Sequence, residues 1–329
     1  MEIKKLTSLT IETTNVCNFS CLICPTNNEM KREKGYMSFD LFQKTISGGK
    51  SLEHLCLHNW GEPTQNKDLF KMIKYAHDKG IRYTVFNTNG SLLDDDIINR
   101  ILDSPLSIMR ISVDGNPDTY KKIRGIDFQI IEKNILNLIK KRNEKNSSLK
   151  IGIVMVVEEQ TEKDMDSFHN KWKAIGDHVR FQPKLIRSQR GQGATTTIRQ
   201  GKPNWTVSKG KPPEGLRSRK TEIKSATAQS AKKTQFPKFA VQRTDLCPEL
   251  FGKDYGKVVV LWDGKVVPCC ADYEGELQIG DILNETVDSI WRGLAMRRLR
   301  KRHLDKDFPQ ICKNCDEYES QKVEKRFVI

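Results

Sequence analysis

The sequence predicts an α/β protein built on a parallel sheet, followed by a smaller α+β unit made of a hairpin and a helix. From residue 5 to about residue 186, six short apolar stretches alternate with amphipathic helical patterns. Repeats of strand and helix build parallel sheets, because each crossover returns the chain to the same edge. A chain of 329 residues is also long enough for one large domain and a smaller one.

The six expected strands are short apolar runs that begin near residues 6, 54, 83, 107, 150 and 178. A helix is predicted over residues 38–49, where Ser38 is a suitable N-cap, and another over residues 128–143. One face of the second helix carries Ile131, Ile135, Leu138 and Ile139. Periodicity does not decide whether the sheet closes into a barrel. In either case, ligands collect at the C-terminal ends of the strands.

The last part of the chain has a different pattern. Residues 257–270 are typical of a β-hairpin, because two apolar runs flank the pair Asp263-Gly264. A helical pattern follows over residues 288–303. We therefore expect a small second domain over residues 244–329.

The net charge of +14 is concentrated in one segment. Residues 184–243 hold fifteen Lys and Arg against two acidic residues, so nearly all of the excess lies there. The segment is rich in Gly, Ser, Thr, Pro and Gln and has little apolar periodicity, which predicts a flexible basic insertion or linker over residues 188–243. It would suit RNA, nucleotide phosphates or an acidic peptide, or serve as a solvated loop without a ligand. No RNA-binding signature accompanies it, so a nucleic-acid partner is not favoured.

Nine cysteines in a chain without a secretion signal argue for metal binding or redox chemistry and against a disulfide framework. The N-terminus lacks the apolar core of a signal peptide, and no run approaches the length of a membrane span. We expect a cytoplasmic protein with no membrane partner.

Three of the cysteines, Cys17, Cys21 and Cys24, form C-x3-C-x2-C directly after the first expected strand. Structural zinc sites normally take four ligands, commonly in paired C-x2-C units. Three thiolates on one loop suit a four-iron cluster that leaves one iron open to an exchangeable ligand.

This motif resembles the signature of the radical S-adenosylmethionine (SAM) enzymes, and further matches follow in order over roughly residues 8–186. The resemblance implies a partial (β/α)6 TIM-like barrel as the core, over residues 1–187. It also implies a [4Fe-4S] cluster on the three cysteines and S-adenosyl-L-methionine as cofactor.

The same resemblance implies a set of cofactor contacts at successive strand ends. Trp60-Gly61-Glu62-Pro63 is similar to the Gly-Gly-Glu-Pro segment that holds the methionine amino group in this family, with Trp60 in place of the first glycine. The segments 87–90 and 112–115 stand where the family meets the ribose and methionine parts of SAM. The cofactor-binding residues implied in this way are Gly61, Glu62, Asn89, Ser112, Asp114, Arg124 and Gly152.

A second cysteine set lies in the C-terminal part, where Cys312 and Cys315 form a typical ligand pair. The pattern resembles the shortened SPASM module, often called twitch, in which a hairpin and helix bind one auxiliary [4Fe-4S] cluster. A structural zinc site fits the number of thiolates equally. Because side chains of a hairpin alternate between faces, only one of two adjacent cysteines is expected to bind. The expected ligands are Cys247, Cys269 or Cys270, Cys312 and Cys315.

The family resemblance implies reductive cleavage of SAM to a 5'-deoxyadenosyl radical, which abstracts hydrogen from a substrate. The twitch-type tail favours a sugar-like or cyclitol substrate that undergoes oxidation, dehydration or epimerisation. The alternatives are a maturase acting on a precursor peptide, an RNA-modifying enzyme, and a non-enzymatic iron–sulfur electron carrier. The expected partners are a small-molecule or peptide substrate and a flavodoxin- or ferredoxin-type electron donor. No general base can be named from the sequence.

Overall fold

The computed structural model describes residues 5–183, 247–251, 256–313 and 315. The predicted insertion at residues 188–243 lies outside them. Six parallel strands occupy the first part of the chain, and each begins within a residue of its predicted start. They are β1 (Leu6–Ile11), β2 (His54–Cys56), β3 (Tyr83–Thr88), β4 (Ile108–Ser112), β5 (Lys150–Val157) and β6 (His178–Pro183).

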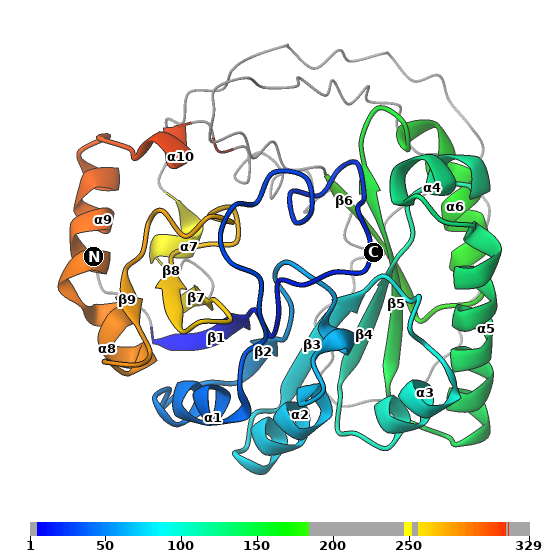
Figure 1. Cartoon of the computed structure of the whole chain (residues 1–329), viewed down its shortest axis with the longest axis horizontal. Coiled ribbons are helices and arrows are strands. Elements are labelled where there is room, and N and C mark those ends of the chain that lie inside the picture. The colour runs from blue at the N-terminus through cyan, green and yellow to red at the C-terminus, as the bar shows by residue number, and fades with distance from the viewer. Residues whose placement is uncertain (1–4, 184–246, 252–255, 314, 316–329) are drawn as a thin grey trace, which may run out of the picture.

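Helices connect these strands and cover one side of the sheet (Figure 1). Ser38 caps the first helix as predicted, since its side chain accepts a hydrogen bond from the backbone of Leu41. In the longest helix, Ile131, Ile135 and Leu138 are buried as expected. The helices are α1 (Phe39–Ser47), α2 (Leu69–Asp78), α3 (Asp95–Leu102), α4 (Pro117–Arg124), α5 (Phe128–Glu144) and α6 (Met165–Trp172), with short 3-10 turns η1 (Pro63–Gln65) and η2 (Glu162–Asp164).

The C-terminal part contributes the predicted hairpin, and a helical region that Gly293 divides in two. Its elements are α7 (Pro248–Phe251), β7 (Gly256–Val260), β8 (Lys265–Val267), β9 (Gly280–Asp281), α8 (Val287–Arg292), α9 (Leu294–Leu304) and α10 (Gln310–Lys313). The hairpin is not separate from the first sheet. β7 pairs in parallel with β1, and the whole sheet has the order β6-β5-β4-β3-β2-β1-β7-β8-β9. The arrangement is that of a partial TIM-like barrel, extended at its open edge.

The pairing of β7 with β1 follows from the composition of β7. Val258, Val259 and Val260 are all fully buried. A strand that is apolar on both faces needs cover on each side, and the free edge of β1 supplies a backbone partner. The sequence predicted the hairpin, but it did not predict that the hairpin continues the barrel sheet.

The two faces of the barrel sheet differ in chemistry. Side chains such as Ile11, Leu55, Met109 and Phe181 point to the helices and belong to the main apolar core. Their neighbours in each strand point the other way, because strand side chains alternate. We call this second side the inner face. The loop that follows β1, dark blue in Figure 1, extends across it.

Candidate iron-sulfur and cofactor site

Cys17, Cys21 and Cys24 lie together on the loop that follows β1. Two asparagine side chains shape this loop by hydrogen bonding to its carbonyl groups. The amide of Asn27 donates to the carbonyl oxygens of Cys17 at 3.1 Å and Phe19 at 2.6 Å. The amide of Asn28 donates to the carbonyls of Cys21 and Cys24, both at 2.8 Å. The sequence analysis missed these two residues, and the only signal for them is an Asn pair close behind the third cysteine.

Ionisation is unfavourable for two of the three thiols, those of Cys17 and Cys21, chiefly because both are largely buried. Burial raises the pKa of Cys17 to about 11, and the charges of Glu62, Cys24 and Cys21 add to the effect. Burial also raises the pKa of Cys21, although Arg124 opposes this. Cysteines bind metal as thiolates. Three thiolates close together in a partly buried loop are unfavourable unless a positively charged centre offsets their negative charge. The donor set therefore fits an iron–sulfur cluster.

Glu62 and Asn89 bring the ends of the second and third strand units next to the cysteine loop. The carboxylate of Glu62 accepts hydrogen bonds from the hydroxyl of Thr88 and the backbone of Asn89, both at 2.7 Å. The side-chain amide of Asn89 donates to Asn18 at 2.9 Å and lies 4.0 Å from the sulfur of Cys17. The predicted cofactor residues on these two ends thus adjoin the predicted cluster ligands.

Gly61 stands in a position that only glycine fits. Its φ angle is +88°, and an added Cβ would lie 2.5 Å from the carbonyl oxygen of Thr14. The preceding residue, Trp60, packs edge-on against Tyr273 with ring centroids 6.0 Å apart. The segment 60–62 therefore lies flat against the loop after β1 and also contacts the C-terminal part.

Asp114 and Arg124 form a buried ion pair at the end of β4. The Nε and Nη2 atoms of Arg124 lie 2.7 Å and 2.6 Å from one carboxylate oxygen of Asp114. The other carboxylate oxygen accepts a hydrogen bond from the backbone of Val156 at 2.8 Å. Arg124 also opposes the rise in the pKa of Cys21 that burial causes. The pair ties β4 to β5 and supports the cysteine loop, and its contacts with SAM remain a prediction, as do those of Ser112.

Gly152 leaves room for a histidine side chain. An added Cβ would lie 2.1 Å from Nε2 of His178, so the imidazole ring occupies the space over the strand at this point. Contact between Gly152 and the cofactor remains a prediction, and it would require this ring to move. Sequence reasoning did not anticipate His178, whose only signal is its place in an expected strand.

The second cysteine set converges from separate segments. Burial raises the pKa of Cys269 well above its ordinary value, and the neighbouring thiols of Cys270, Cys247, Cys315 and Cys312 raise it further. Cys269 thus lies among all four other cysteines of the C-terminal part. Cys270 packs instead against the small apolar cluster of Val259, Leu261 and Val267. This favours Cys269 as the ligand from the hairpin.

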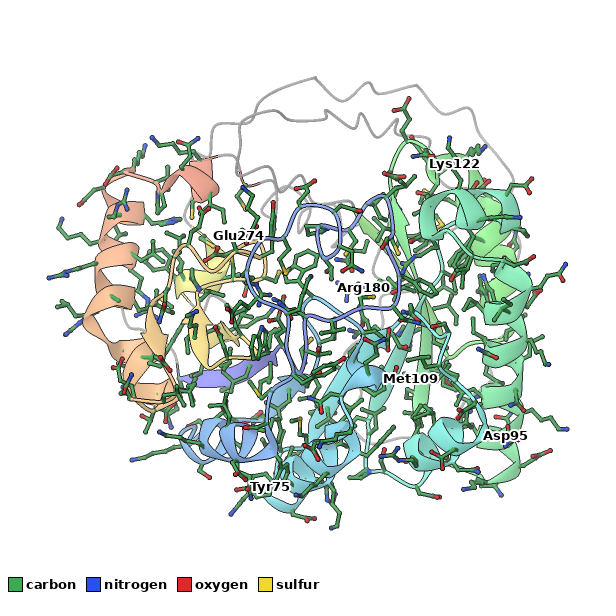
Figure 2. The ribbon with its side chains drawn as sticks, viewed as in Figure 1. Tyr75, Asp95, Met109, Lys122, Arg180 and Glu274 are labelled. Atoms are coloured by element: carbon green, nitrogen blue, oxygen red, sulfur yellow. The ribbon has the colours of Figure 1, made fainter. Side chains whose placement is uncertain are left out.

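Arg32 and Glu274 join the loop that follows β1 to the C-terminal part. Arg32 forms an ion pair with the buried Glu12 and donates to the carbonyl of Tyr273 at 2.6 Å. The carboxylate of Glu274 accepts backbone hydrogen bonds from Lys31 at 2.9 Å and Arg32 at 3.1 Å. Figure 2 shows Glu274 beside this loop. We call this set of contacts the Arg32 junction, and it links the elements that carry the two cysteine sets.

The described residues lack two further features, a site for a single metal ion and a membrane-spanning helix. Within the described ranges, no three His, Cys, Asp or Glu side chains are arranged to hold a single metal ion. Among the same residues, no helix combines the length and the hydropathy that a bilayer span requires.

A parallel barrel sheet with three cysteines on the loop after its first strand, joined to a second cysteine set, defines a barrel protein of the iron–sulfur class. Residues 11–171 match the family described as the Radical SAM superfamily, and residues 252–316 match a family described as an iron-sulfur cluster-binding domain, SPASM. The chain belongs to the radical SAM superfamily and carries a SPASM-type domain. These two domains bind [4Fe-4S] clusters and SAM.

Known proteins resemble the chain over different extents. Fe-coproporphyrin III synthase of Methanosarcina barkeri is 29% identical over 161 residues, which is 46% of this chain and 37% of that protein. For the first four curated relatives, the matched part spans 28% to 46% of the relative's own length.

Two solved structures share the fold at low sequence identity. BtrN in complex with AdoMet and 2-DOIA aligns with a TM-score of 0.57 and 14% identity, covering 100% of this chain and 99% of BtrN. SuiB of Streptococcus suis bound to the precursor peptide SuiA aligns with a TM-score of 0.61 and 12% identity, covering 95% of this chain and 71% of SuiB.

Proposed function

We propose that the chain is a radical SAM enzyme that acts on a sugar-like or cyclitol substrate with the help of one auxiliary [4Fe-4S] cluster. The observation that carries the proposal is the contact between the predicted cluster loop and the predicted cofactor residues. The Asn89 amide lies 4.0 Å from the sulfur of Cys17, and its backbone donates to Glu62 at 2.7 Å. Two elements that the family uses for cluster and cofactor thus meet at one end of the barrel.

The predicted site residues would have separate roles in binding the cluster and the cofactor. Cys17, Cys21 and Cys24 would hold the cluster, and Glu62 would accept a hydrogen bond from the amino group of SAM. When bound there, the cluster would supply the electron for reductive cleavage of SAM. The protein itself would position the cofactor and substrate and keep water from the reacting centre. Cys247, Cys269, Cys312 and Cys315 would hold the auxiliary cluster, whose one-electron chemistry would suit either oxidation or a redox-neutral step.

A flavodoxin- or ferredoxin-type protein is the expected electron donor. The helix α9 carries Arg297, Arg298 and Lys301, which are exposed. Opposite charges steer protein partners into contact, so these cations would favour a donor with an acidic surface. We assign this helix as the candidate docking site for the donor.

Two substrate classes have specific support. The chain and BtrN, which was solved with 2-DOIA, cover each other almost completely, and this favours a small substrate. SuiB was solved with a precursor peptide and gives the TM-score of 0.61, so a peptide substrate is the second candidate. The sugar-like class ranks first because the C-terminal part has five cysteines, enough for one auxiliary cluster.

The deciding experiment starts from anaerobically reconstituted protein, reduced with dithionite and incubated with SAM. We expect 5'-deoxyadenosine, detected by liquid chromatography and mass spectrometry. Adding deuterated cyclitols and sugars, or deuterated peptides, identifies the substrate class from deuterium transferred into the nucleoside. Absence of 5'-deoxyadenosine from protein with a full iron content would reject the enzyme proposal, and transfer from peptides alone would reject the sugar-like class.

A further inference from the structure

Three basic side chains lie next to one another on the inner face of β4, β5 and β6. Arg110 of β4 is level with Gly152 of β5, and Gly152 is level with His178 of β6. Arg180 lies two residues further along β6, where it is level with Val154 of β5 and therefore with Ser112 of β4. In parallel strands, side chains at the same level point to the same face. Figure 2 shows Arg180 on the side of the strands that faces the loop after β1.

Gly152 allows this group to come together. Its missing side chain leaves the space that the ring of His178 fills, at 2.1 Å from where a Cβ would lie. The ring therefore lies over β5, between the strand of Arg110 and its own. Burial and Arg110 lower the pKa of His178, Asp177 raises it, and Arg180 lowers it further. Both guanidinium groups therefore lie close enough to act on the imidazole ring.

Few acidic side chains share the inner face with this group. At the inward positions of β1 to β7 that the structure describes, none is Asp or Glu, although the buried Glu12 and Glu158 directly follow β1 and β5. Lys150, at the start of β5, lies 3.9 Å from Asp177. Of the nearby acids, Asp114 is engaged with Arg124. Asp177, at the start of β6, raises the pKa of His178 but forms an ion pair with Arg142. A substrate with an ammonium group would be repelled here.

We propose that Arg110, His178 and Arg180 form a binding site for an oxyanion, a phosphate or carboxylate group of the substrate. The proposal rests on the proposed function, because it places part of the substrate inside the barrel. Guanidinium groups bind such oxyanions through paired hydrogen bonds, and they keep their charge when partly buried. Arg180 is level with Ser112 at the C-terminal end of β4, so the anion would sit just below the predicted cofactor site. The preferred substrate is then a sugar-like compound that carries a phosphate or carboxylate.

Calorimetry with inorganic phosphate tests the site without catalysis. The full chain with reconstituted clusters is titrated anaerobically in a buffer free of other oxyanions. We expect saturable binding, and a dissociation constant that R180Q and R110Q each raise about tenfold or more, since a hydrogen bond to a charged group contributes about 1.5–3 kcal/mol. R180K keeps the charge but loses the paired geometry and should weaken binding less. R100Q, which removes an exposed arginine of α3, is the matched control and should bind like the wild type.

Two results of these titrations would contradict the proposed anion site. One is the absence of saturable phosphate binding by the wild type, and another is equal weakening in R100Q and R180Q, which would show general charge screening. Circular dichroism and iron content confirm that each variant is folded, and R180K remains informative if R180Q is not. Phosphate binding without 5'-deoxyadenosine formation would reject the proposed function alone. Nucleoside formation without phosphate or succinate binding would reject the anion site alone.

The same titration distinguishes the two chemical sources of the anion. Succinate replaces phosphate at matched ionic strength. Tighter binding of phosphate indicates a phosphorylated sugar or cyclitol. Tighter binding of succinate indicates a carboxylate, as in a sugar acid or an acidic peptide side chain. Binding of neither would remove the proposal.

Discussion

The two cysteine sets of this protein are held in different ways. Cys17, Cys21 and Cys24 lie on one loop, whose backbone is fixed by the amides of Asn27 and Asn28. The second set is drawn from three segments of the C-terminal part, and only the fold brings Cys247 and Cys315 near Cys269. The first set is thus local, while the second depends on tertiary packing.

This contrast indicates which of the two cysteine sets should better tolerate the loss of distant contacts. A loop that is held by hydrogen bonds among its own residues can keep its shape when contacts with distant segments are lost. A site assembled from separate segments loses its geometry when any of those segments moves. The Arg32 junction connects the two, since it fastens the loop after β1 to Tyr273 and Glu274, a few residues beyond Cys269 and Cys270.

The largest effect should come from the local set. Replacing Cys21 with Ala removes a predicted cluster ligand, and SAM cleavage should fall by at least about 100-fold, since even changes around metal ligands cost about 10–100-fold. The measurement is 5'-deoxyadenosine formation together with iron content. Cys56→Ala is the control, because Cys56 lies within β2 and contacts His58 at 3.1 Å. Full cleavage by the Cys21 variant would show that this loop does not hold the cluster.

The second-largest effect should come from the C-terminal cysteine set, which is assembled from separate segments. Cys315→Ala should leave measurable SAM cleavage while product formation falls about 10–100-fold, because the auxiliary cluster loses a ligand. Adjacent residues provide a matched test within the hairpin: Cys269→Ala should behave like Cys315→Ala, and Cys270→Ala should be milder. Product and 5'-deoxyadenosine are measured in the same reaction. Full turnover by the Cys315 variant would make the second set dispensable, and a stronger defect in the Cys270 variant would reverse the ligand assignment.

The third effect concerns the junction between the two regions. Arg32→Ala leaves the buried carboxylate of Glu12 without its cation, which should lower the free energy of unfolding by about 3–5 kcal/mol. Urea unfolding followed by circular dichroism measures the change. Lys31→Ala is the control, since only the backbone of Lys31 contacts Glu274. A loss below about 1 kcal/mol, the range of exposed pairs, would show that the junction does not hold the regions together.

The smallest effect is a pH dependence on the inner face. Burial, Arg110 and Arg180 lower the pKa of His178, so the unfolded chain binds its proton more readily than the folded chain. This contribution to stability is present at neutral pH and is lost as the pH falls below the ordinary histidine pKa of about 6.5. His178→Gln should therefore lose less stability than the wild type between pH 7.5 and pH 5.5 in urea unfolding. His77→Gln, at an exposed site, should follow the wild type, and the same slope in both variants would contradict the assignment.

Much of the architecture was predictable because it depends on local patterns. The starts of the six strands, the cap at Ser38 and the hairpin around Gly264 were predicted from the sequence and are confirmed. The helical pattern over residues 288–303 did not indicate the break at Gly293, where the chain is extended between α8 and α9. Nothing in the pattern of residues 257–270 indicated that this hairpin would pair with β1, since pairing partners far apart in the chain leave no local trace.

The site was predictable in part for the same reason. Cysteine spacing and motifs at strand ends indicated Cys17, Glu62 and Asn89, and the structure brings these three together. The roles of Asn27 and Asn28 depend on how the loop folds back on itself. Their residue types are common in loops of every kind, so the sequence offers no means of selecting them.

Residue types at short, fixed spacings were sufficient to predict the alternation of strands and helices, the three-cysteine loop and the family. The contacts between distant side chains depend on the tertiary structure. It placed Arg32 against Glu12, gathered the C-terminal cysteines around Cys269, and aligned Arg110, His178 and Arg180 on one face. The physical reason is that sheet register and packing fix contacts between segments far apart in the chain, and these contacts follow from the whole set of buried surfaces.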